Sequence, residues 1–123
     1  MRKVTNTEQA VIFAAMSKRN FFLREHIVRF ILDKGFTPTC AFMMYSYFLL
    51  DTVERAKLIR ANNDLIRRSD ELWVFGEIST GVMKEIELAT DLKMLIKYFA
   101  IGDDCTTFKE VSFKDLPIIG NTS

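Results

Sequence analysis

The residues of this chain that could do chemistry gather where an expected strand gives way to a helix. Ser79 and Thr80 follow the apolar sequence Leu-Trp-Val-Phe and stand at a helix start, and Gly81 allows close approach of the backbone to a ligand. The unpaired N–H groups and the positive dipole end of such a helix can hold a phosphate or a carboxylate. The alternative is a plain N-cap followed by a tight turn.

Glu85 is the most unusual residue of the same expected helix. It shares one helical face with Val82, Ile86 and Ala89, so we expect the carboxyl group to face the sheet and to be partly buried. A carboxyl group among apolar side chains resists ionisation and suits a nucleophile or a general acid/base. Alternatively, Glu85 lies at the edge of the apolar stripe and pairs with a neighbouring cation.

Two further loops bring polar side chains to the same edge of the expected sheet. In open parallel sheets, ligands gather beyond the carboxyl ends of the strands. The loop after the first expected strand carries Ser17, Lys18 and Arg19, and the loop after the second carries Tyr45 and Tyr47. We therefore expect all five side chains to contribute to ligand binding.

Three adjacent polar residues, Asn62, Asn63 and Asp64, lie in a segment with helical periodicity. Asn63 falls within the apolar stripe of that helix, so its amide is expected to contact a ligand or to cap a loop. In the alternative interpretation, these residues are surface groups near a fraying helix end.

The elements that must position these residues alternate along the chain. Apolar runs and β-branched or aromatic segments predict strands at residues 10–15, 36–42, 71–75 and 94–101. Apolar periodicity predicts helices at 21–34, 51–68 and 80–92, the first of them capped by Gly35. Pro38 confines the second strand to its second half or to a sheet edge, and a loop is expected at 43–48.

This alternation indicates an α/β protein with a parallel sheet of four or five strands covered by helices. The 123 residues suit one domain. We expect its core to span about 10–102 and to be followed by an irregular tail at 103–123, in which 111–113 and 116–119 are candidates for a short edge strand.

Charge and composition exclude several functional classes. The formal net charge is +1, so no global field attracts nucleic acid. Helical spacing scatters the cations of one helix into a solvated face: Arg55, Lys57, Arg60, Arg67 and Arg68. Cys40, Cys105 and the single His26 form no metal-ligand pattern, and no apolar run approaches a membrane span. We expect a cytoplasmic protein without metal, cofactor, nucleic-acid or membrane partner.

The sequence around Glu85 resembles the nucleoside 2-deoxyribosyltransferase superfamily, and most closely its nucleotide N-glycosidase and uncharacterised prokaryotic and phage branches. The resemblance comprises the strand sequence Ser-Asp-Glu-Leu-Trp-Val-Phe-Gly at 69–76 and a motif formed by Ser79, Gly81, Glu85, Ile86 and Ala89. It implies a flavodoxin-like three-layer sandwich that binds a nucleoside or nucleotide. It also implies that a neighbouring subunit completes the site, so a homodimer or higher homo-oligomer is expected.

By this resemblance, Glu85 attacks the anomeric carbon of a nucleoside or nucleoside 5′-monophosphate, and Ser79 contacts the 5′-phosphate. The family's acid, an Asp before a Leu on the preceding helix, matches Asp64 before Leu65, whereas a gapless match places Asn62 there. Asn62 at the acid position favours a second interpretation, a sensor that binds a nucleotide-derived ligand without turnover. In a third, Tyr45, Tyr47 and Phe48 form a subunit contact of an oligomeric interaction module.

Overall fold

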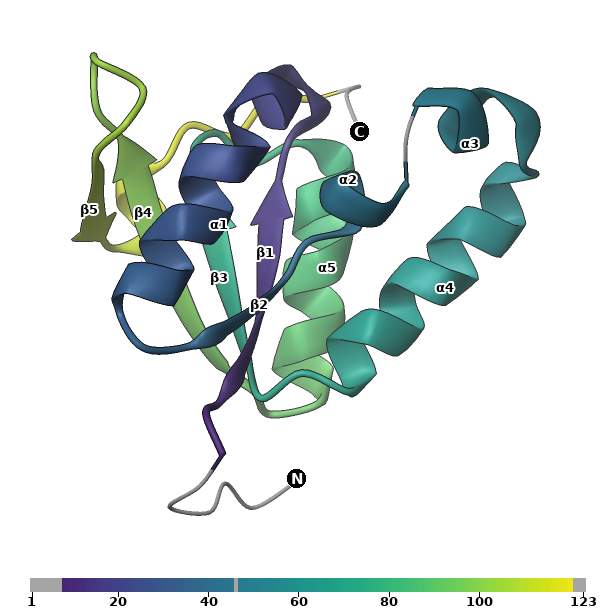
Figure 1. The fold of residues 1–123 in the computed structure, drawn as a ribbon, viewed down its shortest axis with the longest axis horizontal. Helices are drawn as coiled ribbons and strands as arrows, with labels where there is room; N and C mark the ends of the chain where they lie inside the picture. Colours follow the sequence, from purple (N-terminus) through teal and green to yellow (C-terminus); the bar gives the residue numbers. More distant parts are fainter. Residues whose placement is uncertain (1–7, 46, 121–123) are drawn as a thin grey trace.

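A computed structural model describes residues 8–45 and 47–120, with the backbone alone for Tyr47. Five strands form one sheet in the order β2-β1-β3-β4-β5 (Figure 1). The strands are β1 (Val11–Met16), β2 (Thr37–Thr39), β3 (Glu71–Phe75), β4 (Leu95–Ile101) and β5 (Phe108–Val111). The α-helices are α1 (Arg24–Asp33), α2 (Ala41–Met44), α3 (Tyr47–Thr52), α4 (Arg55–Arg67) and α5 (Thr80–Asp91), and the 3-10 helices are η1 (Lys18–Leu23) and η2 (Phe113–Asp115).

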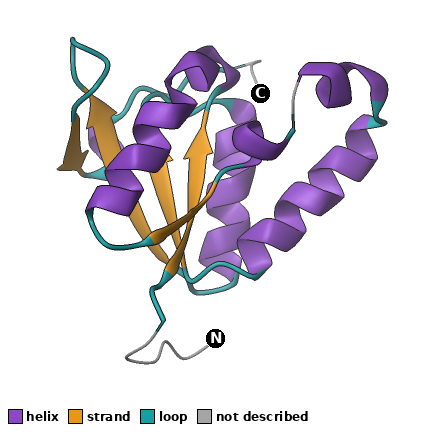
Figure 2. Ribbon diagram, in the orientation of Figure 1, coloured by secondary structure: helices purple, strands orange, loops and turns teal. Residues whose placement is uncertain are grey.

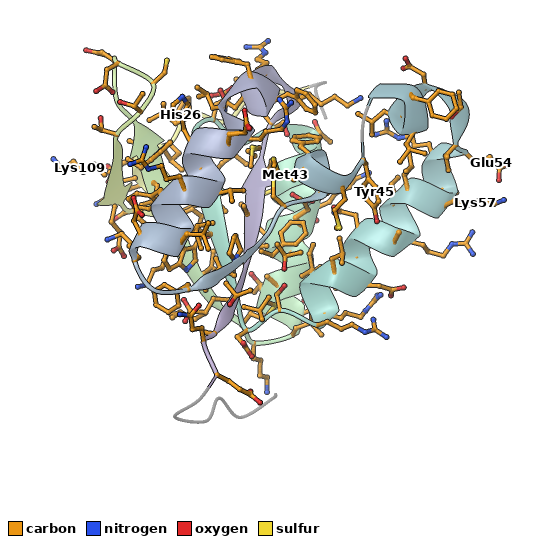
Figure 3. All side chains as sticks on the ribbon, viewed as in Figure 1. His26, Met43, Tyr45, Glu54, Lys57 and Lys109 are labelled. Atoms are coloured by element: carbon orange, nitrogen blue, oxygen red, sulfur yellow. The ribbon has the colours of Figure 1, made fainter. Side chains whose placement is uncertain are left out.

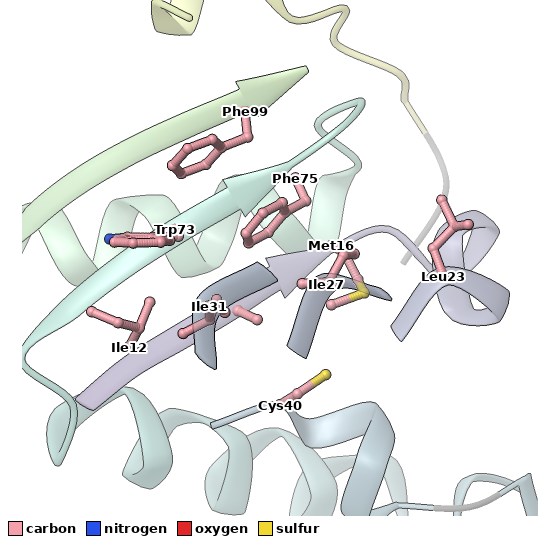
Figure 4. Close-up of a cluster of buried hydrophobic side chains, with 10 residues drawn as sticks. Ile12, Met16, Leu23, Ile27, Ile31, Cys40, Trp73, Phe75 and Phe99 are labelled. Carbon is pink, nitrogen blue, oxygen red and sulfur yellow. The ribbon is translucent and has the colours of Figure 1, made fainter. Parts of the chain in front are cut away.

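The helices cover both faces of the sheet, which confirms the expected flavodoxin-like α/β sandwich (Figure 2). On one face, Ile27 and Ile31 of α1 pack on Trp73, Phe75 and Phe99 of the strands (Figure 4). On the other face, α5 and the end of α4 pack on alternate residues of β1 and β3. Burial on both faces explains why these two strands are continuously apolar.

The carboxyl ends of β1 and β3 lie side by side in the middle of the sheet, because Met16 pairs with Phe75 in a parallel register. From β1 the chain moves outward to β2, and it then crosses back to β3 on the other side of β1. The strand order therefore reverses between β1 and β3. In open α/β sheets such a switch point leaves a crevice where ligands bind.

Several expected boundaries were wrong. The segment predicted as one helix at 21–34 is η1 followed by α1, although Gly35 has the positive φ of 89° expected of a residue just past a helix end. The expected loop at 43–48 contains the end of α2 and the start of α3, and α4 begins at Arg55 rather than at 51. Helices of four and six residues are too short to leave a periodic pattern.

The edge strands also differ from expectation. β2 keeps only three residues of the predicted 36–42, and its Pro38 lies opposite Ile12 at the sheet edge. Four strands are parallel, and the fifth, β5, is antiparallel to β4 and precedes the expected position at 111–113. The tail is therefore less irregular than predicted. Residues 117–119 bond to the backbone on both sides of Ile78, at the loop that leads into α5.

Helix α4 meets the rest of the domain mainly at its carboxyl end. Ile66 is fully buried there, whereas Ile59, which the apolar stripe places on the same side, is 46% exposed. Figure 1 shows the amino-terminal half of α4 and the whole of α3 lying away from the sheet. Helix α4 is therefore tilted away from the sheet, and the tilt leaves space between α4 and α5. No helix within 8–45 and 47–120 is long and apolar enough to cross a membrane.

Two glycines with positive φ make a matched test of this packing. A Cβ at Gly76 would lie 2.7 Å from Ile101 Cδ1 and 2.8 Å from Asn20 Nδ2, whereas a Cβ at Gly35 would meet no atom within 4 Å. We predict that Gly35→Ala costs about 1 kcal/mol of backbone strain and that Gly76→Ala costs more, because the ends of the Ile101 and Asn20 side chains must also shift. Urea unfolding of the two variants measures the difference, and equal losses would contradict the packing described for Gly76.

Candidate functional site

A cavity of about 480 Å³ opens at the switch point, between the carboxyl half of β1 and the helices α2, α4 and α5. Figure 3 shows Tyr45 in the space between α2 and α4. The apolar side chains of the wall come from five elements: Ala14, Met16, Ala41, Phe42, Leu50, Leu58, Ile59 and Val82. The polar or charged lining residues are Lys18, Tyr45, Arg55, Asn62, Asn63, Thr80, Lys84 and Glu85, and Gly81 completes the set.

Glu85 lies half-buried in the wall of this cavity. The packing of Val82, Ile86 and Ala89 on the sheet forces the carboxyl group inward, as the helical spacing predicts. Removal from water raises the pKa of Glu85 from 4.5 to about 7, against the opposing effect of a hydrogen bond from Asn62. Within the described part of the chain, no lysine or arginine forms an ion pair with Glu85. The alternative of a paired carboxylate at the stripe's edge is therefore not what the structure shows.

Asn62 is the partner of Glu85 across the gap between α4 and α5. Its Nδ2 donates a hydrogen bond of 2.5 Å to Glu85 Oε2. The amide thus favours the ionised form of the carboxyl group and fixes its orientation. Asn63 also lines the cavity, so the two adjacent amides both lie in its wall.

Asp64, the other candidate acid, does not line the cavity. It is exposed, and its Oδ1 accepts a bond of 3.0 Å from Arg67 on the outer surface of α4. Two residues correspond to about 200° around an α-helix, so Asn62 and Asp64 cannot face the same side. The structure therefore does not support the expected catalytic role of Asp64.

Ser79 does not reach the cavity either. Its side chain is fully buried, and its Oγ accepts a hydrogen bond of 3.2 Å from Val82 N as the N-cap of α5. The returning tail bonds to the preceding residue, since Ile78 N donates to Pro117 O and Ile119 N donates to Ile78 O. The geometry fits the cap-and-turn alternative for Ser79, while Thr80 and Gly81 lie in the cavity wall.

In the loop after β1, too, only some of the expected residues line the cavity. Ser17 is fully buried, and its Oγ accepts a bond of 3.2 Å from Arg19 N at the start of η1. Arg19 is exposed and lies outside the cavity lining, whereas Lys18 is part of it. Of the two tyrosines expected here, Tyr45 lines the cavity, and the side chain of Tyr47 lies outside the described residues.

Two cations of the cavity were missed by sequence reasoning. The charge pattern predicts a solvated position for Arg55, and no pattern marks Lys84, yet both line the cavity with Lys18. A signal for Arg55 does exist, since Arg55, Ile59 and Asn62 recur at helical spacing on one side of α4. Within the described ranges, no group of three or more His, Cys, Asp or Glu residues could hold a metal ion.

Comparison with known proteins places the chain in a family. Residues 11–99 match DUF7768, a domain of unknown function. Because the match spans well over half of the chain, from β1 into β4, the protein belongs to this family. No curated protein matches the chain.

The raised pKa of Glu85 predicts a stability that depends on pH. The folded protein holds this proton more tightly than the unfolded chain, so the stabilisation is complete below pH 4.5 and is lost as the pH rises to about 7. At about 1.4 kcal/mol per pKa unit, the loss is on the order of 3 kcal/mol.

Urea unfolding at about pH 4.5 and about pH 8 measures this loss. Glu85→Gln should remove the contribution, and Glu87→Gln, on the exposed side of α5, is the matched control that should keep it. The same pH dependence in Glu85→Gln as in the unmodified protein would rule out Glu85 as its source.

Proposed function

We propose that this DUF7768 domain binds a nucleoside or nucleoside 5′-monophosphate and cleaves or transfers its N-glycosidic bond, with Glu85 as the nucleophile. The observation that carries the proposal is the Glu85 carboxyl group in a cavity of about 480 Å³, held by Asn62 at the switch point of the sheet. A pKa of about 7 leaves about half of the group ionised at neutral pH. The resemblance of the sequence around Glu85 to deoxyribosyltransferases supports the same reaction.

In the proposed reaction, a Glu85 oxygen attacks the anomeric carbon while the bond from that carbon to the base breaks. The resulting glycosyl ester is resolved by water in hydrolysis or by a second base in transfer. The bond from Asn62 keeps the attacking carboxyl group in one orientation.

The wall of the cavity suits the other parts of such a ligand. Phe42 and Tyr45 offer aromatic faces for a base, and Leu58 and Ile59 offer apolar contact. Lys18 and Lys84 are exposed cations at the rim, and they suit a 5′-phosphate. Because Ser79 is buried as a helix cap, we now propose these lysines rather than Ser79 as the phosphate contacts.

A sensor without turnover is the second candidate function. One observation favours it: among the described residues of the lining, Glu85 is the only carboxyl group, and an amide stands beside it where an acid would protonate a leaving base. Release of free base from a nucleotide separates the two candidates, since a sensor binds the ligand and leaves it intact.

Association of copies of this chain is a further part of the proposal. Large apolar side chains are exposed on α2, α3 and α4 near the cavity: Met43 (48%), Met44 (50%), Phe48 (70%) and Ile59 (46%). Such a patch suits contact with a second copy, as expected of a homodimer.

The first functional prediction concerns Glu85. Glu85→Gln keeps the size of the side chain and removes the nucleophile, so base release should fall by about a thousandfold or more, while ligand binding is retained. Chromatography of free base from a panel of nucleosides and nucleotides measures the effect. Near-normal release by Glu85→Gln would refute the nucleophile, and Glu87→Gln serves as the control that should leave release unchanged.

The second functional prediction concerns the phosphate. A nucleoside 5′-monophosphate should bind about tenfold or more tightly than its nucleoside, because charge-assisted hydrogen bonds contribute about 1.5–3 kcal/mol each. Lys18→Ala and Lys84→Ala should each reduce this preference in a calorimetric titration. Ser79→Ala should lower stability by about 1 kcal/mol through loss of the cap and leave the preference intact. A preference that survives both lysine substitutions would exclude the rim as the phosphate site.

A further inference from the structure

The cavity combines an inner carboxyl group with outer cations. Glu85 has no cationic partner among the described residues, and its pKa is set by burial and by the amide of Asn62. Lys18 and Lys84 are exposed cations of the lining, and Arg55 adds a third cation. This arrangement is complementary to a ligand with a positive charge near its reacting carbon and a negative charge at its outer end.

We propose that the substrate is a nucleotide whose base is a cationic pyridinium ring, with the ring facing Glu85 and its phosphate at Lys18 and Lys84. This inference rests on the proposed function, and it narrows the substrate to one class of N-glycoside.

The leaving group gives the chemical reason. A neutral purine or pyrimidine departs as an anion unless an acid protonates it, and the lining offers an amide at Asn62 while Asp64 faces outward. A pyridinium ring needs no acid. When the C–N bond breaks, its electron pair passes to the ring nitrogen, and the base leaves as a neutral pyridine.

The steps balance without a proton donor. A Glu85 oxygen forms a bond to the anomeric carbon as the bond to the ring nitrogen breaks. Water then attacks the same carbon, the ester bond breaks, and its electrons return to the Glu85 carboxylate. The products are the sugar phosphate, the neutral pyridine base and one proton, which passes to solvent.

A cationic ring would also provide the charged partner that Glu85 lacks among the described residues. The other ionisable groups of the wall are Lys18 on η1, Tyr45 after α2, Arg55 on α4 and Lys84 on α5. Burial raises the pKa of the Cys40 thiol, before α2, and the charge of Glu85 adds to that rise. A positive ring beside Glu85 would favour the carboxylate and so lower the pKa of Glu85. Binding should therefore release the proton that this group holds.

Calorimetric titration with β-nicotinamide mononucleotide and with its reduced form tests the proposal. The two ligands share the phosphate, the ribose and nearly the same ring shape, but the reduced ring carries no charge. At about pH 8 the oxidised form should bind about tenfold or more tightly. Titration at about pH 7 in two buffers of different ionisation enthalpy should reveal release of about half a proton for the oxidised form alone.

The affinity of the oxidised form should also rise about tenfold from about pH 6 to about pH 8, because only the ionised Glu85 pairs with the ring. Glu85→Gln should abolish the proton release and the preference for the charged ring, and Glu87→Gln should keep both. Nicotinamide release by the unmodified protein, absent in Glu85→Gln, completes the expected result.

Two results would overturn the inference, and they are distinguishable. If a monophosphate with a neutral base is cleaved in a reaction that needs Glu85, while the oxidised and reduced mononucleotides bind equally, the inference fails and the proposed function stands. If neither the mononucleotides nor the neutral-base nucleotides bind, both fail together.

Discussion

The packing of α5 on the sheet is the constraint on which the site depends. Val82, Ile86 and Ala89 must lie against β1 and β3, and helical geometry then carries Glu85 to the same side. A carboxyl group in that position is costly unless it has room and a partner. The tilt of α4 leaves the room, and Asn62 supplies the partner.

The strand order of the sheet determines where the cavity lies. Reversal of the strand order between β1 and β3 leaves a crevice beside their carboxyl ends. The tail forms backbone hydrogen bonds with Ile78 at this edge, and the adjacent Ser79 is buried. The cavity is consequently left on the side of α4, where lysines and aromatic rings surround it.

Much of this arrangement could be predicted because it is local. β1 and β3 are apolar runs, α5 is long enough to show helical periodicity, and the inward direction of Glu85 follows from its spacing to Ile86 and Ala89. The helices α2 and α3 are too short for such a pattern. The tilt of α4 could not be predicted from the sequence either, because an apolar stripe does not show how much of the helix packs against the rest of the domain.

The site residues that were predicted wrongly or missed can each be explained by a specific feature of the structure. Ser79 has the residue type of an anion site, but it is buried as the N-cap of α5, next to Ile78, which bonds to a segment nearly forty positions later in the chain. Asp64 has a carboxyl group that could act as an acid, but it lies on the outer side of α4, where it pairs with Arg67. Arg55 shares one side of α4 with Ile59 and Asn62, but only the packing of α4 near α5 shows that this side and Lys84 face a cavity.

The ionisation of Glu85 can be measured directly. Carbon-13 NMR of protein labelled at the glutamate carboxyl carbons follows each carboxyl group through a pH titration, and comparison with Glu85→Gln identifies the resonance of Glu85. Burial of the carboxyl group predicts a midpoint near pH 7 for this resonance. A midpoint near 4.5, the ordinary value, would contradict it and would show that Glu85 is open to solvent.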